Sequence, residues 1–223
     1  MDVTDTVEDY LKGVFSLTSG GGTASTSAIA EHLGVAASSA STMVSRLRSA
    51  GLVEQVTWGQ VHLTAHGMTH ARGVVRRHRL LETFLHQVLQ LDWAEIHGEA
   101  EILEHGISEH VTDRIDEVLG HPARDPHGDP IPAKSGPHSE LDDGPLQAAL
   151  PGTRFIVRRV VNQDREVLRR LSGVGVTPGV TLNVLGPYSP RAGTEVEAGS
   201  CRRTLAADLV DALRGDVVGL SCG

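Results

Sequence analysis

Six of the ten prolines in this 223-residue chain lie between positions 122 and 145, and they divide it into two parts of different character. Proline has no amide hydrogen and disrupts a helical turn, so this stretch sustains neither a long helix nor a central strand. The 120 residues before it are predicted to be mostly helical, with one break near residues 51–63. After Gly152, short β-prone runs alternate with glycine and proline, which predicts a small antiparallel barrel.

The predicted fold is therefore mainly α over the N-terminal two-thirds, with a small all-β barrel at the C-terminus. We expect four segments, at residues 1–72, 73–138, 139–150 and 151–223, of which the third is a linker. Within the last segment, residues 164–171 are predicted to form a short helix.

The composition indicates a globular protein of the cytoplasm. Hydrophobic residues make up 39% of the chain and charged residues 22%. The uncharged stretch at residues 172–190 contains three prolines and cannot form a membrane-spanning helix, so we expect no membrane partner. The N-terminus is acidic, unlike a signal peptide, and two cysteines are too few for a disulfide framework in a chain of this size.

Two short amphipathic segments, at residues 26–34 and 37–50, are predicted to form a helix–turn–helix. Residues 52–63 are typical of a hairpin that turns near Trp58, which completes a winged helix–turn–helix domain. The second helix contains no acid, and its outer face has small hydroxyl side chains and two arginines. Small hydroxyls let a helix enter the major groove, and arginines contact phosphates or guanine edges. The predicted DNA-binding residues are Ser38, Ser39, Ser41, Thr42, Arg46 and Arg48.

All twelve histidines lie between residues 32 and 138, and most of the net charge of −8 comes from residues 73–120, which hold ten acids and four arginines. Histidines and carboxylates gathered in one segment are typical of a metal site. A helix that follows Asp92 is predicted to place such residues together on one face, beside its apolar stripe. They are His97, Glu101, Glu104 and His105, and the preceding helix adds His78 and Glu82, also one turn apart. Single histidines elsewhere, among them His86, His121 and His127, are interpreted as surface or ordinary core residues.

Several motifs, in order and at the right spacings, resemble the DtxR/MntR family of metal-dependent transcriptional repressors. They are Glu8-Asp9-Tyr10-Leu11, Arg77-His78-Arg79-Leu80 with Glu82, His97-x-Glu99-Ala100, Glu104-His105-x-x-Ser108 and the proline segment Asp125–Pro132. The resemblance is close over residues 5–132 and looser over the tail, which is similar to the family's SH3-like (FeoA-type) domain. It implies a winged-helix domain, a helical dimerisation domain, and a homodimer that binds double-stranded operator DNA and represses genes for metal uptake, manganese transport in particular.

The resemblance also implies two metal ions per chain. The family's regulatory site matches Asp9, Glu101, Glu104 and His105, and its ancillary site matches His78, Glu82 and His97. Either Asp164 or Glu166 is expected to complete the ancillary site from the SH3-like domain. The iron-responsive branch has methionine and cysteine where this chain has Asp9 and Glu101. Because hard oxygen ligands suit Mn(II), we expect manganese as the activating metal, with Fe(II) next.

One position departs from the manganese-responsive pattern. Shorter members of that branch carry a glutamate where this chain has Lys12, which argues against their closely spaced pair of metal ions.

Three other functions are alternatives. An iron-dependent repressor of the same family is the nearest. A metal-buffering or metal-delivery protein would use the barrel as an interaction module. A metalloenzyme is the third, but the sequence has no HExxH motif and an enzyme leaves the basic helix and hairpin unexplained, so we expect no enzymatic activity.

Overall fold

The computed structural model of the chain describes residues 4–19, 22–55, 59–134 and 141–220. The chain folds into two compact units: unit 1 takes in residues 1–78, 104–106 and 132–141, and unit 2 takes in residues 79–103, 107–131 and 142–223. Within the described ranges, no helix is long and apolar enough to cross a membrane.

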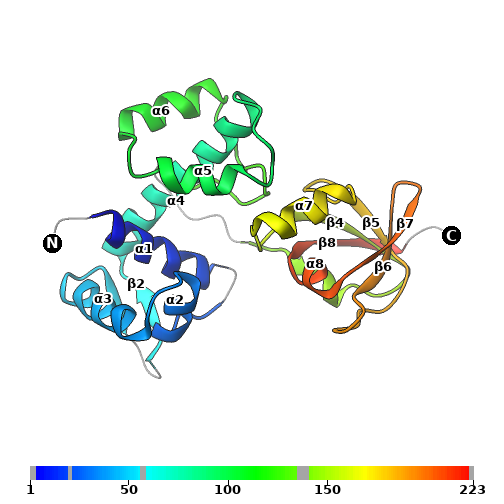
Figure 1. Cartoon of the computed structure of the whole chain (residues 1–223), viewed down its shortest axis with the longest axis horizontal. Coiled ribbons are helices and arrows are strands. Elements are labelled where there is room, and N and C mark those ends of the chain that lie inside the picture. Colours follow the sequence, from blue (N-terminus) through cyan, green and yellow to red (C-terminus); the bar gives the residue numbers. More distant parts are fainter. Residues whose placement is uncertain (1–3, 20–21, 56–58, 135–140, 221–223) are drawn as a thin grey trace. The chain divides into compact units, whose positions relative to one another are not determined.

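Unit 1 is built on helices and one hairpin (Figure 1). Its elements are α1 (Asp5–Thr18), α2 (Thr26–His32), α3 (Ala37–Ser49), β1 (Val53–Gln55), β2 (Val61–Leu63) and the first part of α4 (Ala65–Gln87). The apolar faces of these elements form one core, in which Leu11, Phe15 and Leu47 are at most 1% exposed. Removing such side chains from water is the main force that assembles the unit.

The predicted helix–turn–helix and hairpin are confirmed. The Ser25 hydroxyl accepts a hydrogen bond from the Ala28 amide at the start of α2, and the chain leaves this helix through Gly34 at a φ of 64°. Strands β1 and β2 pair antiparallel, with Val53 opposite Leu63. The turn predicted at Trp58 lies outside the described residues.

The helices of unit 2 are the second part of α4, α5 (Ile96–Leu103) and α6 (Glu109–Val118). The sequence predicts a longer α5, with one helical face that continues through Glu104 and His105, and this prediction is wrong. The helix ends at Leu103, and residues 104–106 form a turn of unit 1. The physical reason is that Glu104 is fully buried in polar contacts of unit 1, which take the place of a further helical turn.

The C-terminal part of unit 2 is an antiparallel six-stranded sheet in the order β3-β8-β4-β5-β6-β7 (Figure 1). Its elements are β3 (Gly144–Pro145), the 3-10 turn η2 (Leu146–Ala148), β4 (Thr153–Val160), α7 (Arg165–Gly173), β5 (Thr181–Val184), β6 (Thr194–Ala198), β7 (Cys201–Leu205), α8 (Ala207–Asp211) and β8 (Leu213–Leu220). Phe155, Leu182 and Leu205 are fully buried in its core. The predicted fold class, helical first and all-β last, is confirmed.

Residues 144–149, expected to be part of a linker, lie in the barrel instead. Pro145 pairs with Arg214 of β8, and Leu146 is only 1% exposed. A proline is tolerated there because β3 is an edge strand, and burial of the leucine holds the segment against the sheet.

The 121–131 segment, which contains three of the clustered prolines, is anchored to strand β4. The Val160 amide donates a hydrogen bond to the His127 carbonyl at 2.9 Å. A Cβ at Gly128 would lie 2.0 Å from the Arg158 carbonyl oxygen, and the φ of 92° at this residue also requires glycine. Arg159 Nη1 lies 3.3 Å from Asp129 Oδ1, and this ion pair also links strand β4 to the segment.

Candidate metal centres and DNA-reading helix

Helix α1 has one apolar and one polar face. Val7, Leu11 and Val14 are buried in the core of unit 1. Glu8, Asp9 and Lys12 are only partly buried and lie on the other side of the helix. Residues three and four positions apart are neighbours on a helix, so these three charged side chains form one patch.

This patch meets the 104–106 turn through His105. The His105 Nε2 atom lies 2.9 Å from Asp9 Oδ1 and 3.4 Å from Glu104 Oε1. On the other side of the ring, Nδ1 lies 2.9 Å from Glu8 Oε2, and Glu8 also pairs with Arg77 at 2.6 Å. Ligand-type atoms of Asp9, Glu104 and His105 lie within 4.8 Å of one another. The structure thus brings together three of the four residues expected in the regulatory site.

Glu104 is the buried anion of this cluster. Its side chain has no exposed surface, and both oxygens have partners: Lys12 Nζ lies 2.5 Å from Oε1, and His78 Nδ1 lies 2.6 Å from Oε2. Burial alone would raise the pKa of Glu104, but the hydrogen bond with His78 and the Lys12 charge lower it below its ordinary value. The carboxylate is therefore held in its charged form by two basic side chains.

The other two members of the cluster respond to the same charges. Burial raises the pKa of Asp9, against the attraction of His105 and Lys12. Burial opposes protonation of His105, but its bond to Glu8 and the negative charges of Glu104 and Asp9 raise its pKa above the ordinary value. The negative charge of these carboxylates favours any cation at the centre of the group, whether it is a proton or a metal ion.

The donor set of the cluster fits a divalent metal ion. Two carboxylates and one imidazole provide oxygen and nitrogen ligands, and neither cysteine of the chain is among them. The 3.4 Å between His105 Nε2 and Glu104 Oε1 matches the roughly 3.4 Å edge of a tetrahedron with bonds of about 2.1 Å. The 2.9 Å between His105 Nε2 and Asp9 Oδ1 is a hydrogen-bond distance, which would widen by about 0.5 Å around an ion.

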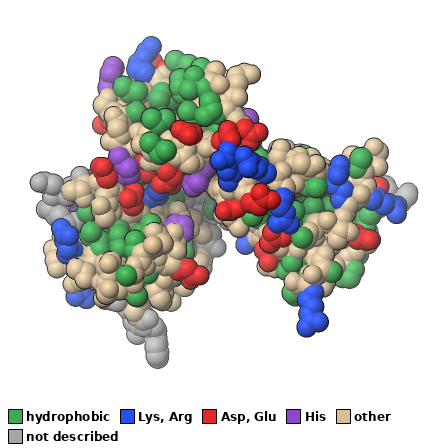
Figure 2. Space-filling view, viewed as in Figure 1, with side chains coloured by type: hydrophobic (Ala, Val, Ile, Leu, Met, Phe, Trp, Pro, Cys, Tyr) green, Lys and Arg blue, Asp and Glu red, His purple; other side chains and the backbone are tan. Residues whose placement is uncertain are grey.

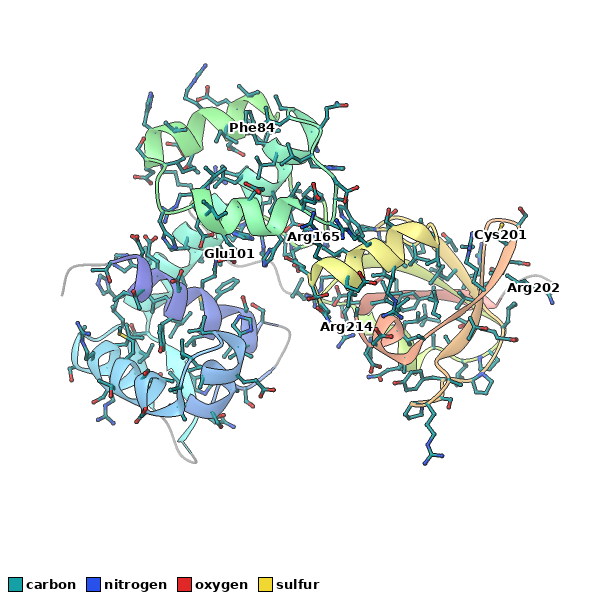
Figure 3. The ribbon with its side chains drawn as sticks, viewed as in Figure 1. Phe84, Glu101, Arg165, Cys201, Arg202 and Arg214 are labelled. Carbon is teal, nitrogen blue, oxygen red and sulfur yellow. The ribbon has the colours of Figure 1, made fainter. Side chains whose placement is uncertain are left out.

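Glu101, the fourth residue expected in the regulatory site, is not a member of this group. It lies on α5 (Figure 3), where its Oε1 is 3.6 Å from His97 Nε2, one helical turn earlier. Its side chain is 41% exposed. Glu8 was missed as a contact of the site, although its place beside Asp9 in the sequence was a signal for it.

A second group of metal-type side chains lies within unit 2. Glu82 Oε1 is 2.9 Å from His97 Nδ1, which brings together two residues expected in the ancillary site. Glu82 also forms a fully buried group with Asp125 and His127, whose ligand-type atoms lie within 4.8 Å of one another. His127 was interpreted from the sequence as a surface or ordinary core residue, and the structure places it, fully buried, in this group.

The residues expected from the SH3-like domain have other surroundings. Asp164 is the N-cap of α7, and its Oδ1 accepts hydrogen bonds from the Glu166 and Val167 amides. Asp164 and Glu166 are both exposed, and within the described residues neither belongs to a metal-type group.

All six predicted DNA-binding residues lie exposed on α3. Ala40, Val44 and Leu47 bury the opposite face of this helix. The outer face contains the hydroxyls and arginines of the prediction, which are Ser38, Ser39, Ser41, Thr42, Arg46 and Arg48. The Thr42 hydroxyl donates to the Ser38 carbonyl at 2.9 Å. A basic, hydroxyl-lined helix after a helix and a turn, followed by a hairpin, has the form of a DNA-reading element.

Three family models match the chain in succession. The iron dependent repressor N-terminal DNA binding domain matches residues 2–59, and the metal binding and dimerisation domain of the same repressors matches residues 53–133. The FeoA domain matches residues 144–215.

Individual relatives agree with these models. The iron-dependent repressor IdeR of Mycobacterium tuberculosis is 34% identical over 195 residues, which cover 82% of this chain and 85% of that protein. The diphtheria toxin repressor of Corynebacterium diphtheriae is 37% identical over 155 residues, covering 70% of this chain and 67% of that protein.

Solved structures extend the similarity to the fold. A manganese-dependent transcriptional repressor in complex with manganese matches with a TM-score of 0.86 and 37% identity, covering 95% of this chain and 99% of that one. The manganese regulator SloR matches with a TM-score of 0.79 and 28% identity, covering 95% and 98%. From the motifs, the fold and these relatives together, the chain belongs to the DtxR/MntR family of metal-dependent transcriptional repressors.

Proposed function

We propose that this chain is a manganese-dependent repressor, which acts in the cytoplasm as a homodimer on double-stranded operator DNA and represses genes for metal uptake. The observation that carries the proposal is the group of Asp9, Glu104 and His105, in which a residue of α1 meets two residues of the 104–106 turn.

The group gives the N-terminal domain a response to metal. A bound divalent ion supplies two positive charges and directional bonds at this point. Asp9 and His105 then hold α1 to the turn, and Glu104 provides the buried charge between them. Because α1 shares a core with α2 and α3, its position determines that of α3. In a homodimer the two α3 helices must match half-sites about 34 Å apart, so a fixed α1 favours DNA binding.

The oxygen-rich ligand set supports manganese as the metal. We propose Asp9, Glu101, Glu104 and His105 as the regulatory ligands, none of which carries sulfur. Raw affinity ranks Mn(II) below the other first-row ions, so selectivity has to come from hard ligands and geometry. Fe(II) is the second candidate, since relatives such as IdeR are named iron-dependent.

A second ion per chain is proposed for the ancillary residues His78, Glu82 and His97. The contact of 2.9 Å between Glu82 and His97 supports this placement. Asp164 and Glu166 remain predictions from family resemblance.

Exposed apolar side chains on the helices of unit 2 support the homodimer. Ile102 is 74% exposed and Val118 is 64% exposed, and hydrophobic side chains gather on the face of these helices that Figure 2 shows. Apolar surface of this kind is typical of a surface that another copy of the chain covers.

The test is DNA binding titrated with metal. The DNA is the chain's own upstream region, the ions are Mn(II), Zn(II) and anaerobic Fe(II), and a chelator provides the metal-free reference. We expect tight binding with Mn(II) that the chelator abolishes. Asp9→Asn should lose the response because one ligand charge is gone, whereas Asp5→Asn, an exposed acid on the same helix, should keep it.

The other outcomes separate the alternatives. A response to Fe(II) but not Mn(II) would assign the chain to the iron-dependent repressors. Binding that does not depend on metal, or no binding, would contradict the proposal and favour a metal-buffering protein.

A further inference from the structure

Two histidines that belong to none of the groups above lie one turn apart at the start of α4. His66 is exposed and His70 is partly exposed, and their ring centroids lie 4.8 Å apart in an edge-to-face contact. Among the described residues, neither imidazole has any other hydrogen bond, ion pair or ring contact. Because residues four positions apart lie on the same side of a helix, both rings can offer a nitrogen to one ligand from solvent.

The helical turn that carries the pair is held firmly by its own backbone contacts. The Gly67 amide donates a hydrogen bond to Thr64 Oγ1 at 3.0 Å, and the Thr64 hydroxyl donates to the Gly51 carbonyl at 2.6 Å. Gly67 packs so closely on Leu52 that a Cβ would lie 1.8 Å from the Leu52 carbonyl oxygen. The two imidazoles therefore need only side-chain rotation to converge on one ion, and no backbone has to be ordered.

The donors available to such an ion are nitrogens without neighbouring carboxylates in the sequence. Residues 55–81 include no aspartate or glutamate. Imidazole suits Cu(II), Ni(II) and Zn(II), whereas Mn(II) binds most weakly in the first-row series and prefers oxygen. The group of Asp9, Glu104 and His105 has the opposite composition, with two carboxylates and one imidazole. The two places are therefore suited to different ions.

We propose that His66 and His70 chelate a late first-row transition-metal ion, such as Cu(II), Ni(II) or Zn(II), on the surface of unit 1. Two histidines at this spacing on one helical face are also how zinc metalloproteases hold two of their ligands. Two protein bonds of about 2.0 Å leave the other positions of the ion to water. The amino end of a helix disfavours a cation, but this lowers the affinity at most about fivefold.

The pair acts independently of the regulatory and ancillary residues because it shares no side chain with them. The chain can therefore hold Mn(II) at the carboxylate-rich group and a late metal at His66 and His70 at the same time. Neither ion displaces the other, since each prefers the donor set of its own site.

Cu(II)–iminodiacetate is the probe that isolates the pair. The chelate fills three positions of the ion and leaves neighbouring positions for two imidazoles. The full chain is first saturated with Mn(II), and binding of the probe is followed by calorimetry and by electron paramagnetic resonance, whose hyperfine splitting counts the bound nitrogens. His66→Gln and His70→Gln each remove one donor. His110→Gln is the matched control, because His110 is exposed on α6 with no histidine one turn away.

We expect the wild type and His110→Gln to bind one chelate per chain through two nitrogens. His66→Gln and His70→Gln should bind it at least about tenfold more weakly, because each loses the second, intramolecular bond. Circular dichroism should be unchanged in all three variants, since the side chains lie at the surface. Equal affinity in all four proteins would overturn the proposal, as would a single bound nitrogen in the wild type or displacement of the probe by excess Mn(II). None of these results bears on the DNA-binding test of Asp9.

Discussion

Lys12 is the residue that most distinguishes the group of Asp9, Glu104 and His105 from a simple set of metal ligands. Its ammonium group lies 2.5 Å from Glu104 Oε1 and is only 14% exposed. A lysine at this distance neutralises the same carboxylate that a metal ion would bind. The two cations therefore compete for Glu104 in electrostatic terms.

Replacement of Lys12 by methionine should shift this competition toward the metal. We expect Mn(II) to bind about tenfold more tightly, equivalent to about 1.4 kcal/mol. The metal-free protein should lose about 3 kcal/mol of unfolding free energy, because a buried carboxylate loses its ionic partner. Competition with a fluorescent chelator measures the first effect, and denaturant unfolding in excess chelator measures the second.

Lys12→Arg is the control, since it keeps the charge and should leave both values near those of the wild type. Weaker Mn(II) binding in Lys12→Met would show that the lysine assists the metal rather than competing with it.

The sequence predicted three of the residues that the structure brings together, Asp9, Glu104 and His105, but not their partners Glu8 and Lys12. Asp9 and His105 follow from motifs, because a ligand's chemistry is visible in the sequence. The contact of Asp125 and His127 with Glu82 was not predicted, because Glu82 lies more than 40 positions earlier in the chain. A contact between residues so far apart in the sequence produces no local pattern from which it could be predicted.

Helix α3 combines the features on which DNA reading depends. Its buried face is fixed by Ala40, Val44 and Leu47, which leaves the polar face open to a ligand. Arg46 lies on that face, where a guanidinium can reach a phosphate or a base edge.

Arg46→Ala should weaken binding to operator DNA. For a phosphate contact, affinity should fall about tenfold on all sequences, and the slope of log affinity against log salt should decrease by about 1. Fluorescence anisotropy at several salt concentrations measures both quantities. Arg114→Ala removes an exposed arginine from α6 and should change neither. An unchanged salt slope in Arg46→Ala would exclude a phosphate contact for this residue.

At the scale of elements, periodic patterns were predicted well and their ends were not. The amphipathic α2 and α3 and the β-prone runs of the barrel followed from spacing alone. The end of α5 at Leu103 and the burial of Leu146 did not, because both depend on tertiary contacts that outweigh local preference. Strand β7 was not predicted, because only Leu205 is buried among its five residues and the sequence therefore shows no alternation of apolar and polar side chains there.

At the scale of the whole molecule, the prediction to test is the homodimer. Ile102 is the most exposed large hydrophobic residue among those described on α5 and α6. A side chain of this kind costs little in the monomer and contributes strongly once a partner covers it.

Ile102→Glu should therefore weaken the homodimer by at least about 2 kcal/mol, which is roughly thirtyfold in the dissociation constant. Light scattering during size-exclusion chromatography at several concentrations measures the change. Val217→Glu is the control, because Val217 is 55% exposed on β8 of the barrel. If both variants dimerise like the wild type, the dimer surface does not include Ile102.

The contacts of Glu104 have a consequence for how such a regulator evolves. Lys12 and His78 already contact the two carboxylate oxygens, so a metal ion that binds Glu104 has to displace at least one of them. The strength of these two contacts then sets the metal concentration at which the displacement occurs. Lys12 belongs to α1 and the DNA-reading side chains belong to α3. If Glu104 binds the metal as proposed, the metal sensitivity of the repressor and its choice of DNA sequence depend on different helices, so evolution can change one and leave the other as it is.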